Sequence, residues 1–441
     1  MIRNTNAVKS TDHSEIALDC IEAAIEAAAP VNAVRSNVTL RGDVLHVCGA
    51  DYDLADYDRV VLVGGGKAGG GVTSTLEALL GERLAGGLVV VKHPAKTEVT
   101  QTAVGDHPLP SERNTAATAE LLDIVDAADK RTLVLFVLTG GASALLTAPA
   151  GDLTVSDLRE TTGRLLSGGV PIDDLNAIRK HLSTVKGGRV AQRAAPATIV
   201  GLLLSDVVGN DPSTIGSGPT VPDDTTFDDA LAAFNRHGVD PPEPVRDHLQ
   251  GGAEGKIAET PFADDAVFEC VANYVVGDNT TALAAARSVA DNAGYEPLVL
   301  TSRLRGEAKE VAKTLVAVGE ESVASGCPVE PPAVLLAGGE CTVTIAGDSG
   351  RGGPNQEFVL SAALELDGSQ IVAAVDTDGE DGSSDAAGAI ADASAVDDAE
   401  AARAHLANND AGTYLSSIGA TIRTGPTGTN VNDIVIIVVP E

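Results

Sequence analysis

The chain of 441 residues contains few aromatic, sulfur-containing or lysine side chains. It has no Trp, one Met, six Phe and five Tyr, and only 10 of its 30 basic residues are Lys. Because 44% of the residues are nevertheless hydrophobic, the core must be built mainly from Val, Leu, Ile and Ala. This apolar content excludes a disordered acidic chain, which could not bury enough surface to offset the entropy of folding.

Cysteine and histidine patterns that would indicate a disulfide framework or a zinc site are absent. The eight His residues form no HxH or HxxxH pattern, and the five Cys residues show no CxxC spacing. We therefore predict buried free thiols in a reducing compartment. The cysteines are Cys20, Cys48, Cys270, Cys327 and Cys341.

The sequence also lacks long apolar runs. A membrane helix needs about 20 apolar residues, whereas the longest runs here, such as 133–138 and 434–439, have the length of a strand. The first 14 residues are polar and contain no apolar stretch of the kind found in signal peptides. We expect a cytoplasmic protein with no membrane partner.

Positive charge is scarce, with 63 Asp and Glu against 30 Lys and Arg and a net charge of −33. Nucleic acids would be repelled by such a chain, which argues against DNA or RNA as a partner. Carboxylates stay hydrated in concentrated salt while the salt screens their repulsion. We interpret the composition as that of a halophilic protein in a high-salt cytoplasm; an ordinary acidic cytosolic protein is the alternative.

Continuous Val, Leu and Ile runs alternate with helical segments along the chain, at 59–63, 87–92, 132–138 and 197–204. This alternation is typical of a parallel sheet with helices on both faces. Pro, Gly, Asp and Glu crowd together over 240–265, which indicates a boundary. We predict two α/β domains, a larger one over 1–258 and a second one over 266–441.

Glycine-rich loops follow several of the predicted strands, where ligands bind in α/β sheets. The first contains Lys67 among six glycines. Glycine allows a close approach of backbone N–H groups to an anion, and a lysine placed there favours phosphate binding by Lys67, Gly65 and Gly66 over a solvated loop lysine. Gly140, Gly141 and Ser143 form a second loop, which we interpret as an anion-binding turn.

Gly64, Gly66 and Gly69 also match the G-x-G-x-x-G pattern of dinucleotide-binding proteins. That pattern predicts an acid at the end of the next strand, which is followed by Lys92 instead. An enzyme that uses NADP could tolerate a lysine there, so a dehydrogenase remains an alternative.

Arg351 lies between glycines, before Gly352 and Asn355, where it could bind a carboxylate or a phosphate. The alternative interpretation is that Arg351 forms an ion pair with a carboxylate on the protein surface. Several aspartates follow apolar strand runs and are candidate Mg²⁺ ligands or proton acceptors. These are Asp206, Asp211, Asp376 and Asp378.

One local basic cluster could face a nucleotide or an acidic substrate, or could simply balance neighbouring acids; both interpretations stay open. It consists of Arg179, Lys180, His181, Lys186, Arg189 and Arg193. His93 and His107 both precede a proline, and we interpret both as loop residues, with a substrate contact as the alternative.

These loops resemble the glycerate 2-kinases of the MOFRL type, a class related to the tartrate-utilisation kinase. The matching segments follow one another in the order of the family and span about residues 60 to 435. They are 63–68, 105–110, 138–145, 205–207, 216–220, 338–340, 350–357 and 376–388. The departures are Gly69-Gly70, where bulkier residues are common, and Pro354, where arginine is frequent.

The resemblance implies ATP-dependent phosphorylation of D-glycerate at its 2-hydroxyl with Mg²⁺ or another divalent metal. It further implies a larger Rossmann-like N-terminal domain, a C-terminal MOFRL-type domain of mixed α/β structure and a site in the cleft between them. Its catalytic lysine and arginine fall on Lys67 and Arg351. We assign Asp206 as orienter or base, Gly352 and Asn355 to phosphate binding, and Asp376 and Asp378 to the metal.

Three points stay open at this stage. The 3-hydroxyl could be the acceptor, the protein could reduce hydroxypyruvate with NAD(P)H, and it could be a monomer or a homodimer.

Overall fold

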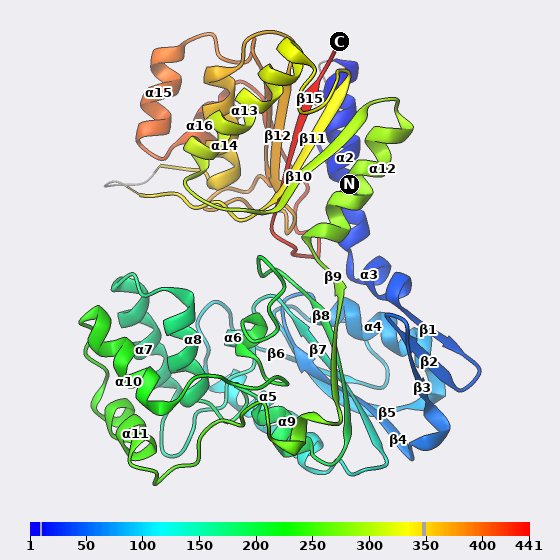
Figure 1. Ribbon diagram of the computed structural model, residues 1–441, viewed down its shortest axis with the longest axis vertical. Coiled ribbons are helices and arrows are strands. Elements are labelled where there is room, and N and C mark those ends of the chain that lie inside the picture. Colours follow the sequence, from blue (N-terminus) through cyan, green and yellow to red (C-terminus); the bar gives the residue numbers. More distant parts are fainter. Residues whose placement is uncertain (9–10, 346–349) are drawn as a thin grey trace. The chain divides into compact units, whose positions relative to one another are not determined.

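The computed structural model describes residues 1–8, 11–345 and 350–441, and these form two compact units. One unit comprises residues 33–276, and the other combines residues 1–32 with 277–441 (Figure 1). The division differs from the predicted boundary near 258–266 because β9 (Val271–Gly277) joins the first sheet beside β8. Within that unit, the hydroxyls of Tyr274 on β9 and Tyr52 are 2.8 Å apart.

The unit of 33–276 is built on a six-stranded sheet in the order β6-β5-β4-β7-β8-β9. All pairings from β6 to β8 are parallel, and β4, β7 and β8 are almost entirely buried. This confirms the predicted parallel sheet. The strands are β4 (Arg59–Gly65), β5 (Leu84–Val91), β6 (Gln101–Val104), β7 (Thr132–Thr139) and β8 (Thr198–Leu204).

Helices cover both faces of this sheet because successive strand residues point to opposite sides. Val61 and Val63 share a core with residues of α5 (Glu112–Asp126) and α9 (Arg189–Ala194). Val60 and Leu62 share the opposite core with α4 (Gly69–Leu80). That second core also includes an antiparallel sheet of three strands, β1 (Val38–Arg41), β2 (Val44–Val47) and β3 (Ala50–Asp53).

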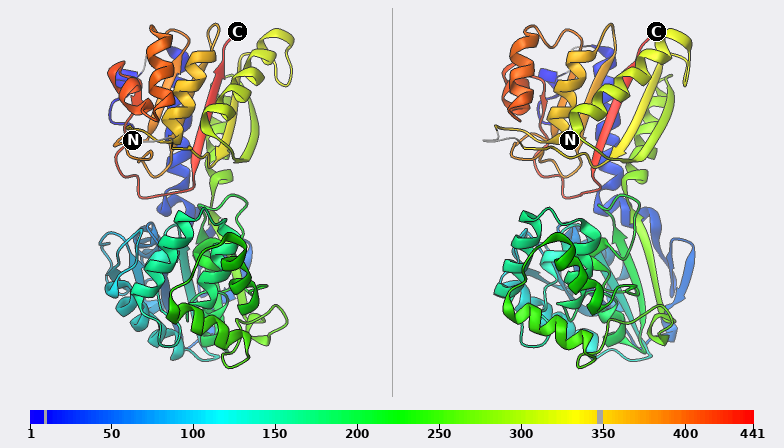
Figure 2. Two further views of the ribbon diagram at one scale, coloured as in Figure 1. Left: turned by 90° about the vertical axis from the view of Figure 1, so that its left-hand side faces the viewer. Right: turned by 60° about the vertical axis from the view of Figure 1, so that its left-hand side comes forward.

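A group of helices in the same unit has a core of its own. Figures 1 and 2 show α7 (Val155–Ser167), α8 (Ile172–His181), α10 (Phe227–His237) and α11 (Glu243–Ala253) lying together. Their shared core contains Leu165, Ile178, Phe234 and Leu249, all nearly inaccessible to solvent. We call this group the helical layer.

The unit of 1–32 and 277–441 has a six-stranded mixed sheet in the order β10-β11-β15-β12-β13-β14. Only β10 and β11 pair in parallel; the other pairings are antiparallel. This confirms the predicted mixed α/β fold of the C-terminal region. The strands are β10 (Glu296–Leu304), β11 (Ala333–Gly339), β12 (Ile371–Asp376), β13 (Gly388–Asp392), β14 (Thr421–Ile422) and β15 (Asp433–Val439). The helices that share a core with one face of the sheet are α13 (Ala308–Ser325), α14 (Pro354–Glu365), α15 (Ala399–Ala407) and α16 (Ala411–Ser417).

The N-terminal helix belongs to this second unit. Helix α2 (Asp12–Ala28) packs on α12 (Asn279–Asn292) and on the sheet, and Ala17, Ile21 and Ala24 are fully buried. Thr11 caps α2, with Ser14 as the third helical residue of a capping box. The remaining helices are α1 (Thr5–Val8), α3 (Pro30–Asn37) and α6 (Ala142–Leu145).

Two expectations from composition can be compared with the fold. All five cysteines are free, as predicted, but Cys48, Cys270 and Cys327 are exposed, so the prediction of burial was wrong for these three. Burial raises the pKa of the Cys20 thiol to about 12. Within the described ranges, no helix has both the length and the apolar character needed to cross a membrane.

Candidate active site

The loop that carries Lys67 lies at the topological switch point of the parallel sheet. The chain runs outward from β4 through β5 to β6 and then returns to the other side of β4 with β7. At such a point the loops after the two central strands diverge and leave a crevice for a ligand. Here those loops are Gly66–Ala68 after β4 and Gly140–Gly141 after β7.

Backbone hydrogen bonds join these two loops. The amide of Lys67 donates to the carbonyl oxygen of Gly140 at 2.8 Å, and the amide of Ala68 donates to the hydroxyl of Thr139 at 3.1 Å. The backbone of Lys67 therefore sets its position, and its side chain is half-buried.

The glycines of the first loop allow this close approach. A Cβ atom at Gly66, whose φ is +141°, would lie 2.0 Å from the hydroxyl oxygen of Thr139. A Cβ atom at Gly65 would lie 2.9 Å from the carbonyl oxygen of Val90. Both glycines thus have a packing role, and their predicted contact with phosphate remains a prediction.

Asp206, which follows β8, lies against the second loop. A Cβ atom at Gly140 would lie 2.1 Å from Oδ2 of Asp206, so only glycine leaves room for this carboxylate. The structure thereby brings together Lys67, Gly140 and Asp206 from three adjacent strands. Asp211 lies further along the same loop, where its carboxylate accepts a hydrogen bond from the amide of Ser213 at 2.9 Å.

His107 lies beside Lys67, although the sequence favoured a plain loop residue. A Cβ atom at Gly141 would lie 3.0 Å from Cδ2 of His107 and 3.0 Å from Cγ of Lys67. Burial and, to a smaller extent, the charges of Lys67 and Lys92 together lower the pKa of His107 to about 4. The imidazole is therefore neutral at pH 7 and can donate or accept one hydrogen bond without adding charge. His107 lies in the segment 105–110, which resembles the family, and this was the signal in the sequence that could have identified it.

Ser143, next to the second loop, makes polar contacts with Ser217 and Lys186. Its hydroxyl lies 3.0 Å from the hydroxyl of Ser217, and its carbonyl oxygen accepts a hydrogen bond from Nζ of Lys186 at 2.7 Å. A pocket of about 330 Å³ opens here, lined by Gly141, Ser143, His107 and residues of the helical layer.

In the other unit, Arg351 forms an ion pair with Asp385, which also pairs with Arg423. The alternative considered from the sequence, a pair with a surface acid, is thus present in the structure. The side chain of Arg351 is half exposed. Arg423 was missed because it is distant in sequence, and only the fold brings it to the same carboxylate.

Asn355 and Gly352 lie at the start of α14. The amide of Asn355 donates to Asp381 at 3.0 Å, so the Asp381 carboxylate satisfies an N–H group in the first turn of the helix. The side-chain amide of Asn355 donates to Asp433 at 2.7 Å. The amide of Gly352 donates to the hydroxyl of Ser383 at 3.2 Å. Gly347 to Ser349, the beginning of this predicted loop, lie outside the described residues.

Asp376 ends β12 directly opposite Asp433 on β15. Burial raises the pKa of Asp376, and the Asp433 and Asp378 carboxylates raise it further. Burial likewise raises the pKa of Asp433 to about 8, although the hydrogen bond from Asn355 opposes the shift. Asp378 accepts from the amide of Glu380 at 2.9 Å. The sequence identified Asp376 and Asp378 but missed Asp433, which begins a strand instead of ending one.

Throughout residues 1–8, 11–345 and 350–441, no three His, Cys, Asp or Glu side chains are grouped so as to hold a metal ion. The two neighbouring carboxylates of Asp376 and Asp433 nevertheless suit an open site, because Mg²⁺ commonly takes one or two carboxylates and completes its shell with water and phosphate oxygens.

Two family models match the chain, a domain of unknown function (DUF4147) over residues 16–250 and the MOFRL family over residues 333–433. The chain is 36% identical to a glycerate 2-kinase of Pyrococcus horikoshii, over 97% of this chain and 98% of that protein. It is 34% identical to a D-glycerate 2-kinase of Thermotoga maritima, over 96% of this chain and 97% of that protein.

Solved structures agree with this similarity. A crystal structure of a glycerate kinase from Thermotoga maritima matches with a TM-score of 0.84 and 33% identity, covering 96% of this chain and 99% of that chain. A crystal structure of a protein from Pyrococcus horikoshii matches with a TM-score of 0.85 and 35% identity over 98% of this chain and 99% of that chain. With identity of this size along nearly the whole length, the chain belongs to the MOFRL-type family of glycerate 2-kinases.

Proposed function

We propose that this protein transfers the γ-phosphoryl group of ATP to the 2-hydroxyl of D-glycerate and releases 2-phosphoglycerate and ADP. The observation that carries the proposal is the 36% identity, over nearly the full length of both chains, to a protein named glycerate 2-kinase. The switch-point crevice supports it, because Lys67 lies where an α/β sheet binds its ligand.

The roles of the residues follow from what phosphoryl transfer requires. The reaction asks the protein to hold the reactants in line and to neutralise developing negative charge. Lys67 would contact phosphate or the glycerate carboxylate, and Arg351 would do the same once it releases Asp385. Asp206 would orient the 2-hydroxyl or accept its proton. His107, neutral at pH 7, would donate a hydrogen bond beside Lys67.

A divalent metal completes this proposal. Mg²⁺ would neutralise charge on the phosphate oxygens when bound. The neighbouring carboxylates of half-buried Asp376 and buried Asp433 are suited to it, and Asp378 follows Asp376 in the same loop. The predicted ligands Asp376 and Asp378 would then belong to an open site that phosphate oxygens and water would complete.

The competing dehydrogenase interpretation has lost its main support. The G-x-G-x-x-G glycines are explained by packing, because a Cβ atom at Gly64 would lie 1.9 Å from the carbonyl oxygen of Val137. Gly66 meets Thr139 in the same way, and a Cβ atom at Gly69 would lie 3.1 Å from a methyl group of Val89. No bound dinucleotide is needed to account for them.

The test is a ³¹P NMR spectrum of the product formed from ATP, Mg²⁺ and D-glycerate. We expect the resonance of 2-phosphoglycerate together with ADP. A 3-phosphoglycerate resonance would overturn the proposed regiochemistry, and the absence of any phosphorylated product would overturn the kinase activity. Oxidation of NADPH with hydroxypyruvate, assayed in parallel, would favour the reductase instead.

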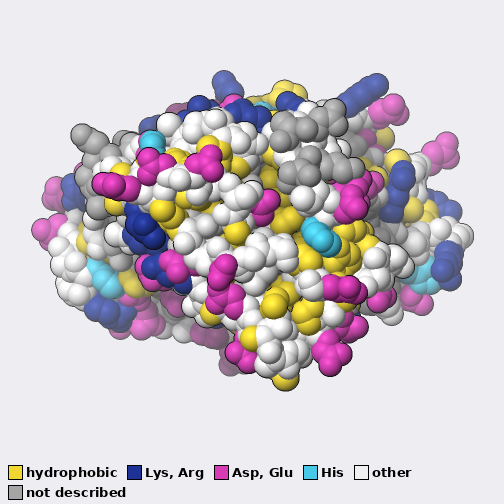
Figure 3. All heavy atoms as spheres, turned by 90° about the horizontal axis from the view of Figure 1, so that it is seen from above, with side chains coloured by type: hydrophobic (Ala, Val, Ile, Leu, Met, Phe, Trp, Pro, Cys, Tyr) yellow, Lys and Arg dark blue, Asp and Glu magenta, His cyan; other side chains and the backbone are white. Residues whose placement is uncertain are grey.

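We also propose a high-salt cytoplasm as the environment of this protein, and a monomer or homodimer as its state. Support for the high-salt environment comes from the net charge of −33 and from the distribution of the charged side chains. Figure 3 shows Asp and Glu side chains scattered over the visible face among Lys and Arg. Light scattering on the purified protein determines the number of subunits.

The charge leads to a prediction about salt. We expect the melting temperature to rise between dilute buffer and about 1 M KCl, where the Debye length falls to roughly 3 Å and repulsion between carboxylates is screened. Differential scanning calorimetry over a KCl series measures the effect, and an equimolar sucrose series controls for solute effects other than ionic screening. A melting temperature that is independent of KCl would contradict the halophilic interpretation.

A further inference from the structure

The pocket of about 330 Å³ in the unit of 33–276 has walls of two kinds. One wall is apolar and comes from the helical layer, with Leu158, Leu165 and Leu166. The other carries the cations Arg179 and Lys186. Small-molecule sites commonly combine such an apolar lining with a few polar groups, at volumes of about 300–1,000 Å³.

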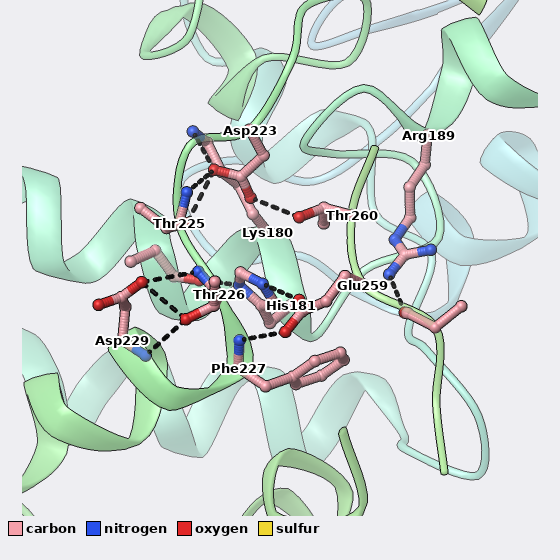
Figure 4. A network of polar contacts seen from close by, with 12 residues as sticks. Lys180, His181, Arg189, Asp223, Thr225, Thr226, Phe227, Asp229, Glu259 and Thr260 are labelled. Atoms are coloured by element: carbon pink, nitrogen blue, oxygen red, sulfur yellow. Dashed lines mark hydrogen bonds and ion pairs between the residues drawn. The ribbon is translucent and has the colours of Figure 1, made fainter. Parts of the chain in front are cut away.

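The structure divides the basic cluster of the sequence into two groups. Three of its six members pair with acids (Figure 4). Lys180 pairs with the fully buried Asp223 at 3.1 Å, and His181 lies 3.1 Å from Glu259. Arg193 pairs with Asp126. Arg189 donates to the carbonyl oxygen of Ala258 at 3.3 Å. For Lys180, His181 and Arg193, the interpretation that the cluster balances neighbouring acids applies.

Arg179 and Lys186 behave differently. In the part of the chain that the structure describes, neither forms an ion pair with a carboxylate. Nζ of Lys186 donates to the carbonyl oxygens of Ser143 at 2.7 Å and Leu146 at 3.1 Å, which are neutral acceptors. Arg179 lies in the last turn of α8, one residue before Lys180. A rotation of about 100° per helical residue lets the two side chains take different directions.

The two cations are close enough to repel each other. Burial and, to a smaller extent, the charge of Arg179 together lower the pKa of Lys186 to about 7. Burial alone lowers the pKa of Arg179 to about 10. Burying two neighbouring cations away from solvent, with no carboxylate to pair with them, is energetically unfavourable. An anionic ligand in the pocket would supply the missing negative charge.

The other residues that line the pocket indicate that the ligand also has an apolar part. Leu166 and Leu109 line the pocket and are 60% and 44% exposed, so an apolar group bound between them would cover them. Glycerate, with three carbons and three polar groups, offers no such apolar body. The pocket also borders the switch-point loop, because Gly141 and His107 line it and a Cβ atom at Gly141 would lie 3.0 Å from Cγ of Lys67.

Resting on the proposed kinase activity, we infer that this pocket is the nucleotide subsite. The base and ribose of ATP lie against the apolar wall formed by α7 and α8, and the phosphates extend past Arg179 and Lys186 toward Gly141 and Lys67. Arg179 is then a nucleotide-binding residue, and the uncompensated charge of the pocket is neutralised by phosphate.

The experiment measures ADP binding without glycerate, by isothermal titration calorimetry on the full chain. We expect Arg179→Ala to weaken ADP binding by roughly 10- to 100-fold, because a hydrogen bond to a charged group is worth about 1.5–3 kcal/mol. The KM for ATP should rise in parallel, and the KM for glycerate should stay within about twofold. Arg193→Ala, which removes an arginine of the same cluster already paired with Asp126, is the matched control and should leave ADP binding unchanged.

A second variant tests the apolar wall at an exposed position. Leu166→Asp places a negative charge at the mouth of the pocket without disturbing the core, and it should also weaken ADP binding.

The melting temperature of the Arg179→Ala variant separates an effect on binding from an effect on structure. This melting temperature should not fall if the charge of Arg179 has no partner in the protein.

The outcomes for the pocket and for the kinase activity are distinguishable. If the wild type phosphorylates glycerate and both variants bind ADP like the wild type, the pocket assignment is wrong and the kinase activity stands. If the wild type binds ADP, the variants do not, and glycerate is not phosphorylated, the pocket stands and the proposed reaction is wrong. A rise in the KM for glycerate alone would make this an acid-substrate site and overturn the inference.

Discussion

Replacement of Lys67 by alanine is expected to lower kcat by about 10²-fold or more while leaving the fold intact. Removing one positioned donor or cation from a developing charge in a transition state typically costs about 10²–10³-fold. The fold should survive because the loop is held by the amide of Lys67, which donates to Gly140 at 2.8 Å and is unaffected by the substitution. Steady-state kinetics with ATP and glycerate measure the first effect, and circular dichroism with thermal melting measures the second.

Two further variants sharpen this test. Lys67→Arg keeps the charge in a different shape and should recover only part of the rate, since the two cations are not interchangeable where geometry matters. Lys313→Ala removes an exposed lysine paired with Glu310 at 3.0 Å and should leave kcat unchanged. A Lys67→Ala enzyme with a near wild-type kcat would remove Lys67 from the proposed mechanism.

Replacement of Asp223 by alanine is expected to destabilise the unit of 33–276 by about 3–5 kcal/mol, because it leaves the charge of Lys180 buried and unpaired. Asp223 is fully buried and Lys180 is 8% exposed. The same carboxylate accepts from the hydroxyl of Thr225 at 2.7 Å and from that of Thr260 at 3.1 Å. Asp223 thus ties α8 to the loops at 223–225 and 259–261 (Figure 4).

Urea unfolding followed by circular dichroism measures this loss. Asp126→Ala, which breaks the more exposed pair with Arg193, is the control and should cost about 1 kcal/mol or less. The double variant Asp223→Ala/Lys180→Met should be less destabilised than Asp223→Ala, because it leaves no lone buried charge. If Asp223→Ala and the wild type have the same free energy of unfolding, the buried ion pair makes no net contribution to stability.

The strands of the first sheet could be predicted closely from the sequence. The apolar runs at 59–63, 132–138 and 197–204 correspond to β4 (Arg59–Gly65), β7 (Thr132–Thr139) and β8 (Thr198–Leu204). Strands buried on both faces contain continuous apolar residues, and that pattern is local. For the same reason, the glycine loops after β4 and β7 could be located at once.

The domain boundaries were harder to predict because they depend on distant contacts. Helix α2 is recognisable from its apolar stripe, yet the stripe does not say which surface it will cover. In the structure it packs on α12 and on the sheet of residues 296–439. Strand β9 (Val271–Gly277) lies beyond the predicted boundary, yet it belongs to the first sheet because it lies beside β8 (Thr198–Leu204), which comes much earlier in the chain.

Within the candidate site, the sequence identified the residues that stand out locally. It singled out Lys67 among glycines and Asp206 and Asp376 after strands. His107 was considered only as the less favoured alternative, and Asp433 and Arg423 were missed. Each of these three acquires its setting from partners far along the chain, such as Asp433 from its register opposite Asp376.

The shortage of lysine and the excess of acid were determined by the sequence alone, and so were the Val-rich strands and the glycine loops that carry cations. Only the tertiary structure decided which cations are neutralised. Lys180 and Arg179 are adjacent in sequence, yet one pairs with buried Asp223 and the other lines a pocket without a carboxylate partner in the described residues. The physical reason is that composition and periodicity are local properties, whereas ion pairing depends on which distant segments the fold places within a few ångströms.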